Sequence, residues 1–449
     1  MPFQSCRADL AICEAIAVGL LCLFLGACEA PHNGTLDPQL ALEIGRMKAI
    51  DNHAHPKRVL AGNDKDDAYD ALPVGMMEPF PLPVRMDPAT GGYLPAMRKL
   101  FNYRHEDMTD AHLHEYLEDK QKVMRQKGEN YANWVLDEMG TDVMLANRVA
   151  MGSGLNPPRF RWVPFADALM YPLNNASLAS ADPDRKSFFM GEEKLLKRYL
   201  TEDNLSALPA KFDDYLKFVA DTLERQKRMG AVAEKFEAAY LRSLDFAAVP
   251  KAEAERVYSI YAHSATPTGG EYKGLQDYLF RYIAAECGRL GMPVHIHTAA
   301  GAGSYFHVGG TNPLLLESVF NDPSLRKTQF VMLHAGWPFT EEAEALLTKP
   351  NVWVDYSCLP YLLYPNGIAE VLRGWLEFMP NKILFGTDAS PTTPEIDWEE
   401  TGYMAASNNR LALGIALTEM IHDGEITHDR AAELARMVLR DNARKLYGW

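Results

Sequence analysis

Two pairs of histidines stand at the ends of short apolar segments, and these residues are well suited to metal chemistry. His53 and His55 lie in the stretch IDNHAHP, and His295 and His297 lie in PVHIHTA. Side chains of a β-strand alternate between its two faces, so residues two apart point to the same side. Each pair therefore presents two imidazoles on one face if its segment is a strand. A polar turn that happens to contain two histidines is the alternative.

Spacing alone is a weak signal, because the chain contains a third pair with the same separation. His112 and His114 lie in DAHLHEYLEDKQKV, a stretch whose pattern predicts a helix. Residues two apart on a helix do not face each other. We therefore expect His112 and His114 to be solvated surface residues.

Single residues of ligand type end two further apolar segments. His334 follows TQFVML, and Asp388 follows KILFGT. Several imidazoles together with one carboxylate suit Zn²⁺, Fe²⁺ or Mn²⁺. By the rise of two strand residues, His295 would lie about 6.6 Å deeper than His297. We expect His295 to be a buried neighbour of the site rather than a ligand.

These residues can meet only if parallel strands bring their ends together. Alternation of β-rich segments with helical patterns predicts parallel βα units, and eight such units predict an α/β fold of the (β/α)₈ TIM-barrel type. Active sites of such barrels lie at the carboxyl ends of the strands. The fourth segment, GAVAEKFEAAYL, also suits a helix. The eight segments are residues 47–55, 141–151, 159–170, 230–241, 292–299, 328–336, 351–357 and 382–390.

Long insertions follow the first and the third strand. Residues 57–100 are too rich in proline for a helix interior, and we expect an irregular loop over one end of the barrel. Such long loops are often lids or binding loops, with decorative surface as the alternative. Helical patterns are expected at residues 105–139, 188–200, 209–229, 274–290, 340–348, 366–378 and 428–446.

Length and composition fit one barrel domain with insertions, or two or three smaller domains, and give little support to a nucleic-acid binder. The chain has 449 residues, is 47% hydrophobic, and carries a formal net charge of −15 rather than a basic face. The N-terminus differs, because residues 15–27, AIAVGLLCLFLGA, form an apolar run too short for a comfortable membrane span. This layout is typical of a secretory signal.

We therefore expect a signal peptide over 1–28, a tether over 29–45 and the barrel domain over 46–449. The sequence LGAC ending at Cys28 resembles a bacterial lipobox, which implies a periplasmic protein or a membrane-anchored lipoprotein. An uncleaved anchor helix is the alternative. Cys287 and Cys358 are the cysteines of the body, and we expect two buried thiols, with one disulfide as the alternative.

Four motifs in order resemble those of the amidohydrolase superfamily: DNHAHP, VHIHTAAG, FVMLHAGWP and ILFGTDAS. More narrowly, the chain is similar to the amidohydrolase-related (amidohydrolase 2) group, which also contains decarboxylases. The runs GAVAEKFEAAYLRSLDF and DNARKLYGW resemble the amidohydrolase half of nodulin/glutamine-synthetase-like fusion proteins. The resemblance covers residues 46–449. It implies that His53, His55, His297 and Asp388 are metal ligands and that Asp388 also transfers protons.

The resemblance leaves three further residues with alternative roles. His334 is either a catalytic group that polarises the substrate or a ligand of a second metal. Lys235 corresponds to a lysine that bridges two metals in binuclear members, with pairing to a neighbouring carboxylate as the alternative. We place Lys235 several residues before a strand end near Tyr240, and so favour one metal. His307 is expected to be exposed, with substrate contact as the alternative. Aromatic residues that could line a pocket or belong to the core are Tyr361, Tyr364, Trp337 and Trp398.

These residues predict a metal-dependent hydrolase. One divalent ion, Zn²⁺ first with Fe²⁺ or Mn²⁺ as alternatives, would activate water against an amide, ester or other C–N or C–O bond of a small organic substrate. Asp388 would accept the proton, and His334 would stabilise the oxyanion. A metal-dependent decarboxylase of a small aromatic or unsaturated carboxylic acid is the first alternative. A non-catalytic surface lipoprotein that binds a metal or ligand is the second. The membrane is expected as a partner only through the lipid anchor, and a homo-oligomer stays open.

Overall fold

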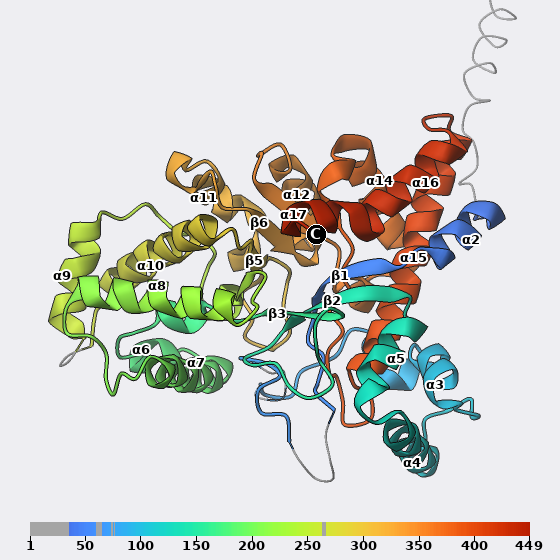
Figure 1. Ribbon diagram of the computed structural model, residues 1–449, viewed down its shortest axis with the longest axis horizontal. Helices are drawn as coiled ribbons and strands as arrows, with labels where there is room; N and C mark the ends of the chain where they lie inside the picture. Colours follow the sequence, from blue (N-terminus) through green and yellow to red (C-terminus); the bar gives the residue numbers. More distant parts are fainter. Residues whose placement is uncertain (1–35, 60–64, 73–74, 76, 263–265) are drawn as a thin grey trace, which may run out of the picture. The chain divides into compact units, whose positions relative to one another are not determined.

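The computed structural model describes residues 36–59, 65–72, 75, 77–262 and 266–449 (Figure 1). The expected signal peptide lies outside these residues. A compact unit extends from Asp37 to Trp449. None of the helices in the described ranges is long and apolar enough to cross a membrane.

Eight strands, all paired in parallel, lie within the eight predicted segments. They form a three-stranded sheet in the order β1-β2-β3 and a five-stranded sheet in the order β4-β5-β6-β7-β8. The strands are β1 (Ala49–Ala54), β2 (Thr141–Asn147), β3 (Phe160–Val163), β4 (Glu234–Phe236), β5 (Val294–His297), β6 (Phe330–Leu333), β7 (Val352–Asp355) and β8 (Ile383–Leu384).

Backbone contacts join the two sheets at both of their edges. Phe165, just after β3, pairs in parallel with Lys235 of β4, and Ala54 at the end of β1 pairs with Ala389 after β8. The amide of Asp388 donates to the carbonyl of His53 at 2.8 Å, which adds a hydrogen bond between β1 and the segment after β8. The strands therefore run in one ring from β1 to β8, and the predicted (β/α)₈ barrel is confirmed.

Apolar side chains from seven strand segments and from α17 (Asn442–Tyr447) form a cluster separate from the main core. Burying each large aliphatic side chain is worth about 1.5–3 kcal/mol. Filled interiors are typical of TIM barrels. The packed interior of this barrel supports the polar residues at the strand ends. The cluster consists of Ile50, Leu145, Val163, Ala233, Val331, Leu333, Trp353, Leu384 and Ala443.

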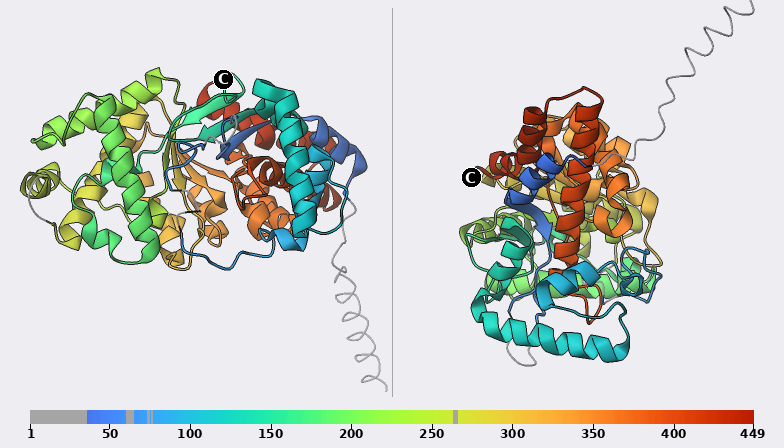
Figure 2. Two further views of the ribbon diagram at one scale, coloured as in Figure 1. Left: turned by 90° about the horizontal axis from the view of Figure 1, so that it is seen from below. Right: turned by 90° about the vertical axis from the view of Figure 1, so that its right-hand side faces the viewer.

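Helices surround the strands (Figure 2). Their ends carry clear signals: Thr268 and Glu271 form a capping box before α10, which ends at Gly291 in the left-handed conformation. The helices that follow β3 and later strands are α6 (Ala176–Ala179), α7 (Pro183–Glu202), α8 (Phe212–Arg228), α9 (Lys251–Tyr261), α10 (Gly269–Leu290), α11 (Glu317–Phe320), α12 (Thr340–Leu346), α13 (Leu359–Leu362), α14 (Pro365–Phe378), α15 (Trp398–His422) and α16 (His428–Arg436).

The insertion after β1 is only partly irregular. The proline-rich stretch forms loops and a short 3₁₀ turn, as expected, but it ends in α3 (Leu94–Phe101). Leu100 and Phe101 are buried there and give this segment an apolar face. The helical prediction for 105–139 corresponds to α4 (Asp110–Lys127) and α5 (Tyr131–Glu138). His114 lies exposed on α4, while His112 is half-buried and pairs with Asp107.

The tether prediction for 29–45 is wrong for its last residues. Residues 38–45 belong to α2 (Pro38–Arg46), which packs against α15 and α16. Leu40 and Ile44 lie one turn apart on its buried face, and the side chain of Asp37 caps its N-terminus. An amphipathic, capped helix of this kind belongs to the folded domain.

Candidate metal and active site

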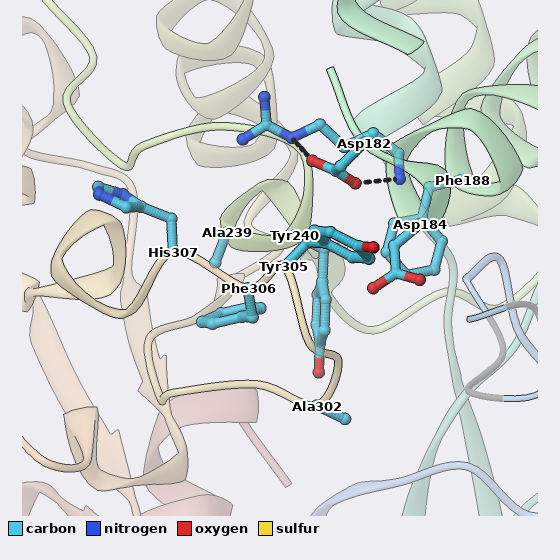
Figure 3. Close-up of a pocket in the computed structure, with 10 residues that line it drawn as sticks. Asp182, Asp184, Phe188, Ala239, Tyr240, Ala302, Tyr305, Phe306 and His307 are labelled. Carbon is cyan, nitrogen blue, oxygen red and sulfur yellow. Dashed lines mark hydrogen bonds and ion pairs between the residues drawn. The ribbon is translucent and has the colours of Figure 1, made fainter. Parts of the chain in front are cut away.

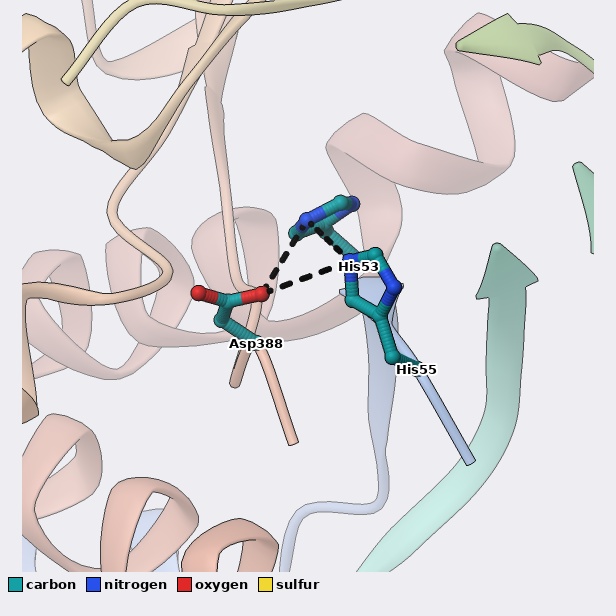
Figure 4. Close-up of side chains that lie close together, drawn as sticks. All are labelled: His53, His55 and Asp388. Atoms are coloured by element: carbon teal, nitrogen blue, oxygen red, sulfur yellow. Dashed lines mark hydrogen bonds and ion pairs between the residues drawn. The ribbon is translucent and has the colours of Figure 1, made fainter. Parts of the chain in front are cut away.

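Three of the predicted ligands converge at the carboxyl ends of β1 and β8 (Figure 4). The Nε2 atoms of His53 and His55 lie 3.3 Å apart. Oδ1 of Asp388 lies 3.2 Å from Nε2 of His53 and 3.7 Å from Nε2 of His55. We call these three residues the histidine–aspartate cluster. Two imidazole nitrogens and one carboxylate oxygen facing one point are a donor set that suits Zn²⁺.

The other nitrogen of each imidazole is held from behind. The amide group of Asn147, the last residue of β2, lies 2.5 Å from Nδ1 of His53. Oδ2 of Asp70 lies 2.9 Å from Nδ1 of His55. The contact between His55 and Asp70 is the kind usual for metal-binding histidines, whose second nitrogen faces a carboxylate that fixes the ring and the tautomer. The residues present therefore fit a bound divalent ion.

His334 lies beside this cluster and has its own support. Its Nδ1 is 2.9 Å from Oγ of Ser357 and 3.9 Å from Oδ2 of Asp388. The hydroxyl of Ser357 donates to Oδ1 of Asp355 at 2.6 Å, and the same oxygen accepts the backbone N–H of His334 at 2.8 Å. Ser357 and Asp355 thus fix both the ring and the backbone of His334.

His297 lies near the cluster without joining it. Its ring is 4.6 Å from the ring of His334 and 4.8 Å from that of Tyr240, measured between centroids. Its Nε2 faces the carbonyl of Ala299 at 3.0 Å. Among the described residues, no group of three closely spaced ligand atoms includes His297.

His295 is completely buried one layer below, as predicted. Its Nε2 lies 2.7 Å from the hydroxyl of Tyr447 in α17. That hydroxyl also contacts Asn52, whose amide donates to Asp355 at 2.8 Å. A chain of polar contacts therefore runs from the C-terminal helix to the carboxylate that supports the backbone of His334.

Lys235 lies closer to the cluster than predicted. We placed it several residues before a strand end near Tyr240, but β4 ends at Phe236 and a 3₁₀ turn covers Ala238–Tyr240. The prediction of the strand end was wrong because EAAY turns as a helix-forming sequence would. Nζ of Lys235 lies 3.4 Å from Nε2 of His53 and 3.8 Å from Oε1 of Glu237.

Residues 175–449 match the family model described as amidohydrolase. The chain belongs to the amidohydrolase family. Protein fluG of Emericella nidulans is 27% identical over 221 residues, which make up 46% of this chain and 24% of that protein. The match thus spans about a quarter of that relative's length.

Solved structures show the same fold as this amidohydrolase. A protein of Lactobacillus casei ATCC 334 described as a metal-dependent hydrolase is 18% identical, with a TM-score of 0.62 over 91% of this chain and 97% of its own. Glucuronate isomerase of Caulobacter crescentus is 11% identical, with a TM-score of 0.60 over 93% and 97% of the two chains. Uronate isomerase of Thermotoga maritima is 14% identical, with a TM-score of 0.59 over 80% and 78%.

Burial sets the charge states of the amidohydrolase site. It raises the pKa of Asp388 to about 6, although the neighbouring His55 and Lys235 act in the opposite direction. Burial also holds the pKa values of His53, His297 and His334 well below the usual value for histidine, and Lys235 adds to this effect. At neutral pH these three imidazoles are uncharged, as metal ligation requires.

A cavity of about 340 Å³ opens onto Asp388 and His297. Its walls come from residues 80–86 of the proline-rich insertion, from the loop at 300–304 and from the aromatic rings of Tyr240 and Tyr361. None of the described residues that line it is a lysine or an arginine. The cavity is therefore a mainly apolar chamber with the acidic and imidazole groups at one side.

The proline-rich wall is fixed at two points. The backbone N–H of Glu78 donates to Asp184 of α7 at 2.9 Å. Arg85 donates to the carbonyl of Pro360 at 3.1 Å and lies 4.5 Å from the ring centre of Tyr364. These contacts hold the segment over the strand ends, as the prediction of a loop over the barrel requires.

A second hollow on the other side of Tyr240 is too small for a substrate (Figure 3). Its volume is about 10 Å³, which admits one water molecule at most. His307 is exposed, and its ring points away from Tyr240 (Figure 3). Of the predicted aromatic residues, Tyr361 lines the large cavity, whereas Tyr364 is exposed and Trp398 is buried in the core.

Sequence reasoning missed several residues of the site. Asp355 and Ser357 repeat the two-residue spacing at the end of β7, so the rule that found the histidines could also have found them. Asp70 and Glu237 gave no such signal, because neither stands at the end of a clear apolar run. Among the described cysteines, Cys287 is buried as predicted, but Cys358 is only partly buried and lines the cavity.

Proposed function

We propose that this amidohydrolase is a metal-dependent hydrolase acting on an uncharged amide or ester of a small organic molecule. The observation that carries the proposal is the convergence of His53, His55 and Asp388 beside a cavity large enough for a small substrate. A divalent ion held by these residues would lower the pKa of water and create a nucleophile at neutral pH.

Asp388 is suited to move the proton of the attacking water. Its Oδ1 faces the two histidines, whereas Oδ2 is turned towards His334, and the side chain borders the cavity. A pKa of about 6 means that the carboxylate is charged at neutral pH and still basic enough to accept a proton. The same group can then return the proton to the leaving amine or alcohol.

His334 is suited to position and polarise the substrate carbonyl. Ser357 and Asp355 hold its ring and backbone, so its orientation is set before substrate arrives. A preorganised polar group next to the developing oxyanion stabilises the transition state more than a flexible one.

The lining of the cavity favours an uncharged substrate that carries an apolar group. Tyr240, Tyr361 and the residues 80–86 supply aromatic and aliphatic surface, and none of the described residues that line the cavity is a lysine or an arginine that could pair with a carboxylate. This lining gives less support to the alternative of a metal-dependent decarboxylase of a small aromatic or unsaturated carboxylic acid.

Matched histidine variants test the proposal directly. The double variant His53→Ala/His55→Ala should lose both bound metal and turnover, whereas His112→Ala/His114→Ala on α4 should keep both. Asp388→Asn should abolish turnover on a panel of neutral amides and esters, with Asp119→Asn on α4 as the control. Activity that survives exhaustive chelation, or release of CO₂ from an acid substrate without hydrolysis of any amide or ester, would refute the hydrolase assignment.

We also propose export through residues 1–28, because residues 15–27 form the apolar run of a secretory signal. Cell fractionation and the mass of the mature N-terminus test this. Incorporation of a radiolabelled fatty acid into the wild type, but not into Cys28→Ser, would establish lipidation. A protein that stays in the cytoplasm with its N-terminus uncleaved would contradict export.

A further inference from the structure

The C-terminal helix α17 closes the end of the barrel opposite to the active site. Its first residue, Asn442, donates to the carbonyl of Ile383, the first residue of β8, at 2.8 Å. After the helix, the ring of Trp449 stacks on that of Tyr447 with 5.1 Å between ring centres, and its centre lies 5.2 Å from the guanidinium of Arg161 in β3. The helix is therefore attached to the strands near both of its ends.

The hydroxyl of Tyr447 has one hydrogen and faces two partners inside the barrel. It lies 2.7 Å from Nε2 of His295 and also contacts Oδ1 of Asn52. Nδ2 of Asn52 donates to Oδ2 of Asp355 at 2.8 Å, so the amide oxygen of Asn52 is left to accept. Tyr447 therefore donates to Asn52 and accepts from His295. This arrangement fixes which way the amide of Asn52 points.

Asp355 connects Asn52 to the backbone and the ring of His334. Its Oδ1 accepts the backbone N–H of His334 at 2.8 Å and the hydroxyl of Ser357 at 2.6 Å, and that hydroxyl lies 2.9 Å from Nδ1 of the imidazole. Among the described residues, Asn52 alone donates to the other oxygen, Oδ2. A carboxylate that is held at both oxygens does not rotate, so Asn52 determines how Asp355 presents Oδ1 to His334.

His334 depends on this support because its backbone is strained. The angle φ is 66° at His334 and 62° at Ala335, and residues other than glycine rarely adopt such values. A conformation of this kind persists only where the surrounding structure imposes it. The hydrogen bond from the backbone N–H of His334 to Asp355 is a contact that holds the chain in this conformation as it leaves β6.

We propose that Tyr447 and Asn52 are positioning residues of the active site, which act through Asp355 on the backbone and the ring of His334. Neither of the two lines the cavity or belongs to the histidine–aspartate cluster. The inference rests on the proposed function in one respect, since it takes His334 to polarise the substrate. It makes the orientation of this imidazole depend on a helix at the opposite end of the barrel.

Turnover of the neutral amide or ester that the wild type hydrolyses fastest tests the proposal. Tyr447→Phe should lower kcat by about 10-fold, because a small displacement of a positioned group costs up to about 100-fold. It should leave KM and the affinity for Zn²⁺ unchanged, since the lost contact serves the transition state rather than binding. Tyr258→Phe is the matched control and should keep the kcat of the wild type, because the hydroxyl of Tyr258 donates to the carbonyl of Pro209 at 2.7 Å and to no residue of the site.

Two further measurements separate positioning from a general loss of stability. If Tyr447 acts through Asn52, the double variant Asn52→Ala/Tyr447→Phe should have the same kcat as Asn52→Ala alone, whereas independent effects would multiply. Nitrogen NMR of the imidazoles needs no substrate. The signals of His334, assigned by their absence in His334→Gln, should shift in Tyr447→Phe and stay unchanged in Tyr258→Phe.

The outcomes that overturn the proposal are an unchanged kcat in Tyr447→Phe, a double variant in which the two single effects multiply, and His334 signals that do not shift in Tyr447→Phe or shift equally in Tyr258→Phe. A wild type that hydrolyses no amide or ester of the panel refutes the proposed function. The imidazole signals then decide the inference alone.

Discussion

Replacing Asp70 by asparagine probes how the ligand His55 is oriented. Asp70 comes from the insertion after β1, and its carboxylate lies 2.9 Å from Nδ1 of His55, with both side chains nearly buried. Although burial opposes the charged form of Asp70, the neighbouring His55 holds the pKa of this carboxyl below its usual value. Asp70 therefore presents a charged carboxylate to the Nδ1 side of the imidazole. It leaves Nε2 of His55 free to face Asp388.

The size of the effect follows from this geometry. Asparagine keeps the shape of the side chain but removes the charge, and it offers Nδ1 either a weaker acceptor or a competing donor. Loss of such a partner typically weakens metal binding by about 10–100-fold. This corresponds to about 1.4–2.7 kcal/mol of binding free energy. The fold should be little affected, because the loop keeps its second anchor, in which Arg148 and Asp66 form a buried ion pair.

A competition assay with a chromophoric chelator measures the dissociation constant of Zn²⁺ for the wild type and for Asp70→Asn. Asp67→Asn is the matched control, because Asp67 lies in the same loop but is exposed. We expect the control to bind as the wild type does. An affinity of Asp70→Asn within a factor of about three of the wild type would refute the role of Asp70. Equal weakening in both variants would mean that the loop, rather than the contact with His55, is responsible.

Three further predictions concern protonation and stability. Burial raises the pKa of Asp388 to about 6, so protons should compete with the metal below that pH. The metal affinity, measured by chelator competition, should therefore be constant from pH 7 to 8 and decrease below about pH 6. An affinity that stays constant down to pH 5 would contradict this. Lys120 is buried between two glutamates of α15, 2.8 Å from Glu400, so Lys120→Ala should lower the free energy of unfolding by about 3–5 kcal/mol in urea titrations. The exposed Lys122→Ala is the control and should leave the urea midpoint unchanged, because a surface ion pair contributes little to stability. Tyr447→Phe removes the hydroxyl that contacts both His295 and Asn52. We expect the free energy of unfolding to fall by about 1–3 kcal/mol. An unchanged urea midpoint would show that this hydroxyl contributes nothing to stability.

The strands and the first cluster could be predicted because they depend on local pattern. The alternation rule placed His53 and His55 on one side, and apolar runs located His334 and Asp388 at strand ends. The helical pair at His112 and His114 showed where the rule does not apply, and the structure places that pair on α4.

What could not be predicted depends on loops and on side-chain direction. The end of β4 was misplaced because Ala and Glu give no sign of where a three-residue strand stops, and so the approach of Lys235 to His53 was missed. The ring of His297 faces the carbonyl of Ala299, whose position depends on the loop after β5. Asp70 reaches His55 from an insertion that carries no strand pattern.

The backbone hydrogen bonds that close the barrel between β1 and the segment after β8 also assemble the site. The amide of Asp388 donates to the carbonyl of His53 at 2.8 Å, and the amide of His55 donates to the carbonyl of Ala389 at 2.7 Å. The hydrogen bonds that join β1 to the segment after β8 therefore also set the separation of the three ligand side chains. An ion that binds this cluster ties together the first and the last strand of the ring, which are far apart in sequence. Since only the folded chain presents the cluster, metal at 100 times its dissociation constant should add about 2.7 kcal/mol to the free energy of unfolding. The His53→Ala/His55→Ala variant should show no such gain, and an equal gain in that variant would place the stabilising ion elsewhere.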